Sequence, residues 1–456
     1  MSIAQAPFER RTVASLAMLY AFRMLGLFMV LPVLTLYGDS YSGASPLLLG
    51  LALGAYGFSQ AILQIPFGVL SDRIGRKPVI AAGLLVFTIG SVLAAQADSV
   101  YELILGRLLQ GGGAIAGAVM ALLADLTSEE NRTKAMATIG GAIGLSFSLA
   151  LVIGPLLASW GGLAAIFWLT ALLGLVGLWV LWKLVPSVKR PPRRRREVGA
   201  VPELIRDVLR DRELLRLNLG IFVLHFVLMA LFLVMPGRLE GDLGVTRDHH
   251  WFVYLPLLAG AFIAMLPFII IGEKRRQMKP VFLLAVGLLG VSLLAQLWAH
   301  SVVWVLATLF LFFMAFNLLE ASLPSLVSKT APAGAKGTAT SIYSSCQFFG
   351  AFAGGSLGGW LLQSGGPALV AGVSLGLVML WWLVAAGMRP PRYLASLLMP
   401  LQGRVSEEFS ERLYQVPGVE EVVVVESEGT AYLKVDSQRV DRKQLTAIAE
   451  QCVFPR

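Results

Sequence analysis

The stretch GVLSDRIGRK, residues 68–77, lies between two long apolar runs and brings four charged side chains close together. Gly75 suits a tight turn, because glycine accepts backbone conformations that other residues avoid. Asp72 can cap the end of a helix and pair with a base, while Arg73 and Arg76 offer forked donors that fit carboxylates. The stretch therefore predicts a charged turn that joins two apolar helices.

The rest of the chain is equally apolar. Of its 456 residues, 56% are hydrophobic and only 14% are charged, against about 25% charged in soluble proteins. The net charge of +9 falls in short basic bursts between apolar runs, a pattern that membrane topology explains better than nucleic-acid binding. Two cysteines, Cys346 and Cys452, cannot build a disulfide framework or a four-ligand zinc site, so we expect no metal or other cofactor.

Apolar runs of about 20 residues, the length that crosses a bilayer, occur twelve times. The first run follows Arg10 and Arg11, and it is too long for the apolar core of a signal peptide, so we expect it to be retained. The twelve predicted spans cover 13–37, 46–70, 78–97, 101–125, 134–158, 162–185, 215–237, 250–271, 280–299, 302–326, 337–362 and 366–388.

Basic residues gather in the connections that follow even-numbered spans. Connections after odd-numbered spans hold almost none, with Arg238 and Arg247 as the exceptions. This alternation is typical of the positive-inside rule and predicts that both termini are cytoplasmic. The basic residues are Arg73, Arg76, Lys77, Arg132, Lys134, a group from Lys189 to Arg216, Lys274, Arg275, Arg276, Lys279, Lys329 and Lys336.

The longest connection divides the chain into six spans plus six. Residues 191–196 read PPRRRR, and the apolar residues from Val201 to Leu209 then repeat at helical spacing, which predicts an amphipathic helix on the inner membrane face. The basic group 189–216 either sets topology only or also binds anionic lipids. The expected domains are 1–185, the linker 186–214, the second half 215–390 and a cytoplasmic domain 391–456.

Three motifs resemble those of the major facilitator superfamily. Residues 68–77 are similar to its signature loop, and residues 272–276 (GEKRR) look like a degraded copy in the second half. Residues 107–111 (RLLQG) match its R-x-x-Q-G element. Gly154 and Pro155 are similar to the core of its antiporter motif, although neighbouring positions carry alanine or serine where the family usually has glycine.

Longer stretches are similar to one subgroup, the YajR-type proteins: 23–34, 131–137, 315–326 and 336–339. That resemblance implies a proton-driven exporter of drug-like compounds in a bacterial inner membrane. It also implies a charge network between Asp125 and the signature loop that locks the outward-facing state, with a plain structural brace as the alternative. The residues of this expected latch are Gly68, Asp72, Arg73, Gly75, Arg76, Lys77 and Asp125.

Ionisable groups at membrane depth are costly and therefore indicate function. Glu320 is the leading candidate for the proton carrier, because burial in an apolar cavity favours a neutral carboxyl group; a brace to a cation is the alternative. His225 either gains and loses a proton during transport or only packs against neighbouring helices. Arg23 binds an anionic group of the substrate or holds a carboxylate, and Arg107 lies in the outer half of the fourth span.

Polar residues four apart share one face of a helix. Gln60 and Gln64 do so in the second span, as do Tyr343 and Gln347 in the eleventh, and Asn317 stands one turn before Glu320. These side chains either line the substrate cavity or form hydrogen bonds between helices.

The composition turns soluble after residue 392. The order strand, helix, two strands of a hairpin, helix and very short closing strand suggests a ferredoxin-like fold. The expected ranges are 395–401, a helix that starts at Ser406, 419–426, 431–436, 441–451 and 452–456. This domain either senses a ligand, regulates transport, pairs subunits or is inert.

The sequence thus predicts an all-α polytopic membrane protein, with twelve helices in two six-helix halves and a small α+β ferredoxin-like C-terminal domain. We expect it to exchange protons for an amphiphilic or drug-like solute and to move the solute outward by alternating access. The alternatives are uptake by symport or facilitated diffusion, and a sensor derived from a transporter. No nucleotide loop, metal-ligand spacing or nucleophile elbow occurs, so we expect no enzyme and no nucleic-acid partner.

Overall fold

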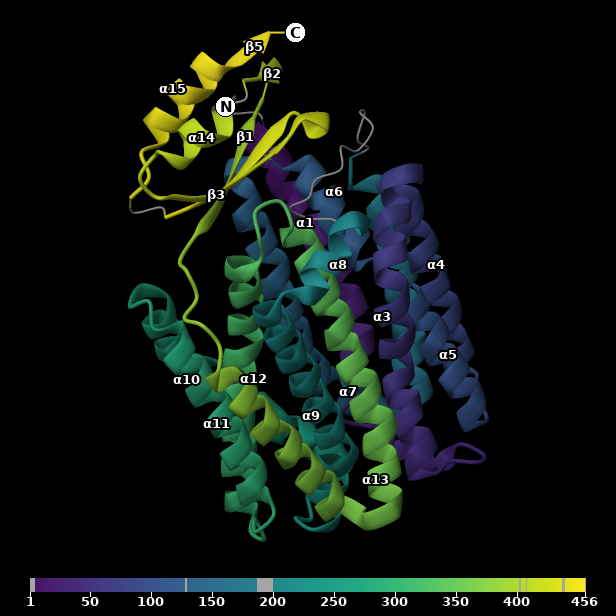
Figure 1. Ribbon diagram of the computed structural model, residues 1–456. Coiled ribbons are helices and arrows are strands. Elements are labelled where there is room, and N and C mark those ends of the chain that lie inside the picture. Colours follow the sequence, from purple (N-terminus) through teal and green to yellow (C-terminus); the bar gives the residue numbers. More distant parts are fainter. Residues whose placement is uncertain are drawn as a thin grey trace.

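Long apolar helices run side by side through most of the protein, and a small domain of strands and helices lies at one end of them (Figure 1). The computed structural model describes residues 5–127, 129–186, 200–401, 403–406, 408–436 and 439–455. We call residues 395–455 the tail domain, the end of the bundle near it the tail end, and the opposite end the far end.

The described residues of the first half form seven α-helices before the linker. They are α1 (Gln5–Phe28), α2 (Leu34–Tyr37), α3 (Pro46–Ile74), α4 (Arg76–Ala95), α5 (Val100–Gly112), α6 (Ala116–Leu126) and α7 (Glu129–Lys183). Two of the predicted spans are not single helices. The span 13–37 is interrupted at residues 29–33, and the span 101–125 is interrupted at residues 113–115. Pro32 cannot donate a helical hydrogen bond, and the run Gly111–Gly113 lowers helix propensity at the second break.

The second half follows a short helix, α8 (Pro202–Arg210). Its long helices are α9 (Arg212–Gly241), α10 (His250–Lys274), α11 (Met278–Gln296), α12 (Val302–Thr330) and α13 (Lys336–Ala386). Within the described residues, ten helical stretches are long and apolar enough to span a membrane.

Two of those stretches are long enough to cross twice. Helix α7 has 55 residues and α13 has 51, whereas about 20 residues cross a bilayer. The backbone leaves helical geometry at Gly161 and Gly162 in α7 and at Gly366 in α13. In Figure 1, α13 runs to the far end and the chain then returns toward the tail end. The described helices therefore provide the twelve crossings predicted.

Helix α13 packs against both α9 and α3, and glycines set the distance between the halves. A Cβ added to Gly50 would stand 2.3 Å from the carbonyl oxygen of Gly355, and one added to Gly54 would stand 2.6 Å from that of Phe352. Only glycine permits such close backbone approach. The far-end parts of α3 and α13 are thus in direct main-chain contact.

Several glycines nearer the tail end have open space beside them. No heavy atom lies within 4 Å of a Cβ position at Gly68 of α3, or at Gly140, Gly141 and Gly144 of α7. The closest main-chain approach between the halves among these glycines is thus at the far end.

The amphipathic helix predicted in the linker is present as α8. Val208 is buried in it while Leu209 is exposed, and just before it Val201 N donates to Thr338 Oγ1 at 2.9 Å. The linker therefore contacts the start of α13. The basic residues 189–196 lie outside the described residues.

The tail domain contains β1 (Ala395–Pro400), β2 (Gly403–Val405), α14 (Phe409–Tyr414), β3 (Val419–Val425), β4 (Thr430–Val435), α15 (Arg442–Cys452) and β5 (Val453–Pro455). Its main sheet is antiparallel with the order β1-β4-β3. The helix predicted to start at Ser406 begins at Phe409 instead. The short closing strand exists, but it pairs with β2, which follows β1, and not with the main sheet. The fold is ferredoxin-like with its last strand displaced.

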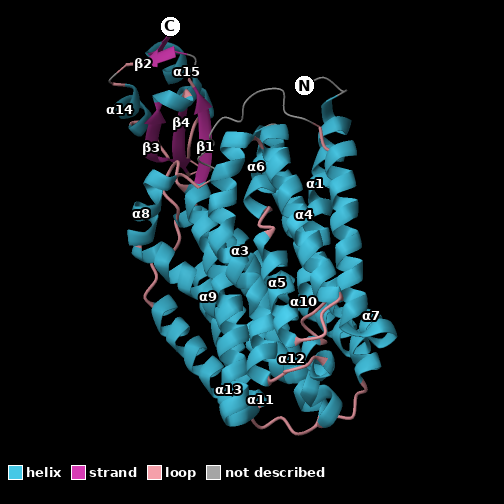
Figure 2. Ribbon diagram, turned by 90° about the vertical axis from the view of Figure 1, so that its right-hand side faces the viewer, coloured by secondary structure: helices cyan, strands magenta, loops and turns pink. Residues whose placement is uncertain are grey.

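The tail domain contacts two connections of the second half. From α12, the carbonyl of Ser328 accepts a hydrogen bond from Lys434 Nζ at 2.8 Å, and Ala333 N donates to Glu421 Oε2 at 2.9 Å. In the turn between α10 and α11, Arg276 forms an ion pair with Asp436 at 3.4 Å. In Figure 2 the sheet lies directly above the ends of the helices. The sheet face opposite α14 and α15 is thus covered by the bundle.

Tyr393 links the tail domain to both connections. Its hydroxyl accepts from Met278 N at 3.1 Å and donates to Gly272 O at 3.3 Å. Arg276 and Lys329 stand 5.2 Å and 4.9 Å from its ring centroid. Burial raises the pKa of Tyr393 above 10.0, so the neutral phenol is the form that this contact holds.

Candidate functional site

Three polar side chains meet inside the second half. Gln347 of α13 donates through Nε2 to Glu320 Oε1 of α12 at 3.1 Å, and its Nε2 is 2.8 Å from His225 Nε2 of α9. His225 Nδ1 lies 3.3 Å from Ile221 O, which fixes a hydrogen on Nδ1 and leaves Nε2 as the acceptor. The histidine is therefore neutral in this arrangement, and Gln347 bridges it to the carboxylate.

Glu320 is incompletely paired. Its Oε2 is buried without a hydrogen-bond partner among the described residues and lies 3.9 Å from His225 Nε2. The side chain as a whole is 35% exposed, against 8% for His225. A buried carboxylate oxygen without a donor is costly as an anion, and a proton on it removes that charge. Tyr343 is buried nearby with an unpartnered hydroxyl, and Asn317 is half-buried.

A second polar cluster lies inside the first half. Arg23 of α1 donates through Nη2 to Gln60 Oε1 of α3. Arg107 of α5 donates through Nη1 to Gln110 Oε1 at 2.9 Å. The guanidinium carbons of the two arginines stand 5.6 Å and 5.2 Å from the ring centroid of Tyr56, which lies between them in the contact network. Both arginines are buried, so the cluster holds two cations away from solvent.

The sequence interpretation missed Tyr56. Its signal was its position four residues before Gln60, which places both on one face of α3. The stripe extends one turn further to Gln64, whose Nε2 donates to Ser341 O of α13 at 3.0 Å. Ser345 Oγ also crosses between the halves, donating to Ala61 O at 3.0 Å. In this conformation Gln64 therefore forms a hydrogen bond between helices, whereas Gln60 contacts a predicted cavity residue.

The signature loop forms a charge network within the first half. Arg76 pairs with Asp72, donates through Nε to Asp125 Oδ2 at 3.2 Å and through Nη1 to Ser71 Oγ at 2.6 Å. Gly75 has φ of +99°, as the predicted turn requires. These contacts join α3, α4 and α6, and therefore brace one half internally.

The remaining motif residues lie beside this network or apart from it. Lys77 Nζ donates to Val185 O at 2.5 Å, while Arg73 is exposed. In the related turn of the second half, Glu273 pairs with Lys329 at 2.7 Å. At the antiporter-like motif, a Cβ on Gly154 would stand 2.3 Å from Met29 O. Gly154, followed by Pro155 within α7, thus lets that helix touch the break in the first span.

At the far end, an arginine of the second half reaches the first half. Arg247 donates through Nη1 to Leu36 O at 3.0 Å and stands 5.1 Å from the ring centroid of Tyr37. Glu240 accepts from Nε at 2.7 Å and from Nη2 at 3.1 Å, which holds the guanidinium in place. The sequence signal for this contact was the exception of Arg247 to the positive-inside pattern. Glu240 and Tyr37 carried no such signal.

The other exception, Arg238, stays within the second half. It donates to Ala299 O at 2.7 Å, to Gln296 O at 3.2 Å and to Asp242 Oδ2 at 3.4 Å. These bonds tie the end of α9 to the end of α11. Arg238 is thus a brace within one half, whereas Arg247 connects the two halves.

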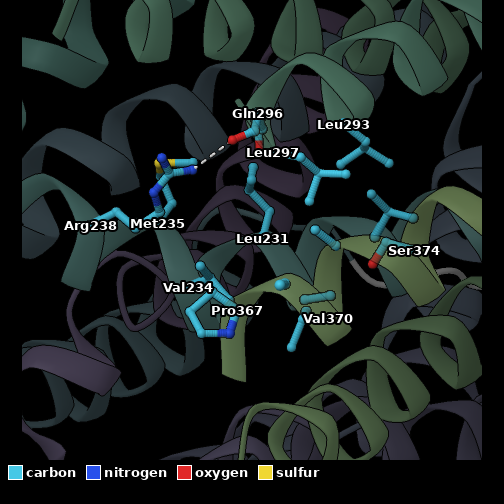
Figure 3. A pocket seen from close by; sticks show the side chains of 14 residues that line it. Leu231, Val234, Met235, Arg238, Leu293, Gln296, Leu297, Pro367, Val370 and Ser374 are labelled. Carbon is cyan, nitrogen blue, oxygen red and sulfur yellow. Dashed lines mark hydrogen bonds between the residues drawn. The ribbon is translucent and has the colours of Figure 1, made fainter. Parts of the chain in front are cut away.

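A cavity of about 200 Å³ lies beside Arg238, among α9, α11 and the last part of α13. Figure 3 shows the bond from Arg238 to Gln296 at one side of it and Ser374 at another. A second cavity of about 380 Å³ lies between the halves at the far end. Neither cavity is lined by a residue of the two polar clusters, so both are separate from the candidate site.

Comparisons with known proteins agree with this architecture. Residues 16–355 match the family described as Major Facilitator Superfamily, and residues 398–451 match the YajR YAM domain. The inner membrane transport protein YajR of Escherichia coli (strain K12) is 47% identical over 450 residues, which cover 98% of both chains. Multidrug resistance protein MdtH of Aeromonas salmonicida is 28% identical over 323 residues, 69% of this chain and 78% of that one.

A solved structure supports the fold. The crystal structure of a D-xylose–proton symporter aligns with a TM-score of 0.65 over 84% of this chain and 98% of that one, at 16% identity. At such low identity the likeness concerns the fold alone. Together with the family match over most of the chain, it shows that the chain belongs to the major facilitator superfamily and is a membrane transporter of that type, with a C-terminal YajR YAM domain.

Proposed function

We propose that this transporter is a proton-coupled antiporter that exports a small amphiphilic or drug-like solute across the bacterial inner membrane. The observation that carries the proposal is Glu320, a carboxylate within the bundle whose Oε2 has no hydrogen-bond partner among the described residues. Its contacts are a glutamine and a neutral histidine, so binding and loss of a proton would change the charge of the whole cluster. His225, bridged to it through Gln347, is the second proton-coupling candidate.

The packing of the two halves supports alternating access. We assign the tail end to the cytoplasm, in line with the distribution of basic residues. The outer end is then closed by main-chain contacts at Gly50 and Gly54 and by the hydrogen bond from Arg247 to Leu36 O. Toward the inner end, no heavy atom lies within 4 Å of the Cβ positions of Gly140 and Gly144. This is the packing expected of an inward-facing state, with residues 1–185 and 215–390 as the moving halves.

Two observations favour export. The name of MdtH, a relative over two thirds of this chain, describes multidrug resistance. The position of Gly154 against Met29 gives the partial antiporter motif a structural role at the break of the first span. The Arg76 network is formed here although the packing is that expected of an inward-facing state, which supports a structural brace more than a latch of the outward-facing state.

The test uses everted membrane vesicles with an imposed pH gradient and a panel of amphiphilic solutes. Wild-type protein is expected to dissipate the gradient with at least one solute, and Glu320→Gln is expected to abolish this without loss of protein from the membrane. Glu273→Gln, which removes a carboxylate of the tail-end turn, is the matched control. Solute-dependent proton movement that persists in Glu320→Gln would rule out Glu320 as the carrier.

Uptake by symport is the rival within transport, and the same vesicles separate it from export. Antiport drives the solute into everted vesicles whose lumen is acidic, whereas symport drives it out. A sensing role is the remaining alternative, supported by the tail domain's contacts with both connections of the second half. A chain without residues 391–456 that transports normally would confine the tail domain to regulation or signalling.

A further inference from the structure

The arginine cluster of the first half lacks an anion. Arg23 contacts Gln60 and the Tyr56 ring, while Arg107 contacts Gln110, the ring and, at 3.4 Å, the carbonyl of Ala52. All of these partners are electrically neutral. Within the ranges that the structure describes, neither guanidinium group forms a salt bridge. Two permanent positive charges are thus held in the bundle by dipoles alone.

Burial makes this arrangement expensive. Arg23 is 2% exposed and Arg107 is 1% exposed, while Tyr56 and Gln60 are fully buried. Taking a charge out of water costs several kcal/mol per ion, and buried cations are normally compensated by a nearby anion. Arginine does not escape the cost by losing its proton, because its guanidinium stays charged in proteins. An anion that enters the cluster would offset this cost.

The unused atoms of the cluster define the chemistry of the missing partner. Five polar groups of the cluster are buried and have no hydrogen-bond partner among the described residues. They are Arg23 Nε and Nη1, Arg107 Nη2, Gln60 Nε2 and the hydroxyl of Tyr56. Four of these five groups are donors only, and the phenol can also donate. A ligand that satisfies them must accept several hydrogen bonds and carry negative charge, which describes an oxyanion such as a carboxylate.

The cluster also lies next to the surface along which the halves separate. Tyr56 and Gln60 flank Gly57 and Ala61 on α3, and a Cβ on Gly57 would stand 2.6 Å from the carbonyl of Phe348 in α13. Transporters of this architecture bind solute between their halves near the bilayer midplane. The cluster thus involves the helix that forms this contact, beside the region where such a solute would bind.

Resting on the proposed function, we propose that Arg23, Arg107, Tyr56 and Gln60 form the binding site for the carboxylate of the transported solute, which is an amphiphilic organic anion. The aromatic ring of Tyr56 and the apolar helix faces around it supply the contact for the apolar part. Proton exchange and anion binding are then carried out by different halves.

The test measures thermal unfolding of the purified full-length protein with straight-chain carboxylates of increasing length, from acetate to decanoate, and with the matching amides. At least one carboxylate is expected to raise the unfolding midpoint, while its amide does not. Loss of the charge-assisted contacts in Arg107→Gln or Arg23→Gln should weaken binding roughly tenfold or more. Arg238→Gln, an arginine variant outside the cluster, should bind as the wild type does.

Gln60→Glu is a second variant that keeps the test valid if the arginine variants fail to fold. It places a carboxylate on the atom that already accepts from Arg23, so the variant should unfold at a higher temperature than the wild type and no longer respond to carboxylates. The proposal is overturned if no carboxylate shifts the midpoint, if the amides act equally, if chloride gives the same shift, or if Gln60→Glu still responds. This readout needs no pH gradient, so its failure leaves the proton-coupling proposal standing, and the reverse also holds.

Discussion

The two halves of the bundle carry opposite kinds of polar groups at membrane depth. In the first half, two arginines surround Tyr56 and have only neutral partners. In the second half, Glu320 contacts a glutamine and a neutral histidine. The first set keeps its charge at any physiological pH, whereas the second changes charge when it gains or loses a proton.

The difference indicates a division of tasks. A fixed charge suits recognition of a ligand of opposite sign, because its attraction does not vary with pH. A group that titrates suits coupling to a proton gradient, because its occupancy follows the pH of the side to which it is open. Since α3 and α13 form the contact between the halves, motion along that contact would connect the two tasks.

The largest effects are expected from variants that remove the central charge of one cluster at a time. Glu320→Gln should eliminate the dependence of solute movement on a pH gradient but preserve exchange of solute for solute. Arg107→Gln should lose both, because the solute no longer binds. Counterflow in proteoliposomes, measured with and without a gradient, distinguishes them. Identical losses in both variants would show that the clusters do not act separately.

A smaller effect is expected from Gln347→Leu. This change removes the bridge and leaves His225 Nε2 and Glu320 Oε1 without their shared donor, which costs about 1–3 kcal/mol. We expect the pH at which transport is half-maximal to shift, while anion binding by the first half stays as in the wild type. Ser364→Ala, which removes a hydroxyl that donates to Trp360 O of the same helix, is the control. An unchanged pH profile would contradict the proposed bridge.

The far-end contact offers a third comparison, between two arginines. Arg247→Ala removes a bond between the halves, and for a partly exposed group this should favour opening by about 1 kcal/mol, or roughly fivefold. Arg216→Ala breaks contacts within the second half only, at the opposite end of the bundle. Thiol labelling of a cysteine placed at Thr35, which lines the far-end cavity, should speed up in the first variant alone. Equal labelling rates would argue against a gate at Arg247.

The smallest effect concerns the tail domain. The pKa of Tyr393 is raised by burial, so the stability that its contact provides is complete below pH 10.0 and is lost as the pH rises through the folded-state value. Limited proteolysis at the connection before β1 should therefore accelerate above that pH in the wild type. Tyr393→Phe should remove this pH dependence. A variant that keeps the same alkaline transition would exclude Tyr393 as its cause.

Periodicity and charge placement predicted most of the architecture. Apolar runs of bilayer length fixed the helices, and Gly75 and Arg76 in the signature loop indicated the turn and the network that the structure contains. Pro32 indicates a kink in the first span, but the break at 113–115 was not predicted, because apolar composition continues through it. The displaced strand β5 was also missed, since strand pairing depends on contacts distant in sequence.

Individual residues of the candidate site could be predicted from the sequence, but the contacts between them could not. The sequence alone determined that Arg23, Arg107, His225 and Glu320 lie within apolar spans, because the cost of burying charge marks such residues. Only the tertiary structure decided that the arginines share Tyr56 without an anion, that Gln347 joins Glu320 to His225, and that Arg247 crosses between the halves. Hydropathy records how deep a residue lies along its own helix, whereas pairing depends on the rotation and packing of helices that are far apart in the chain.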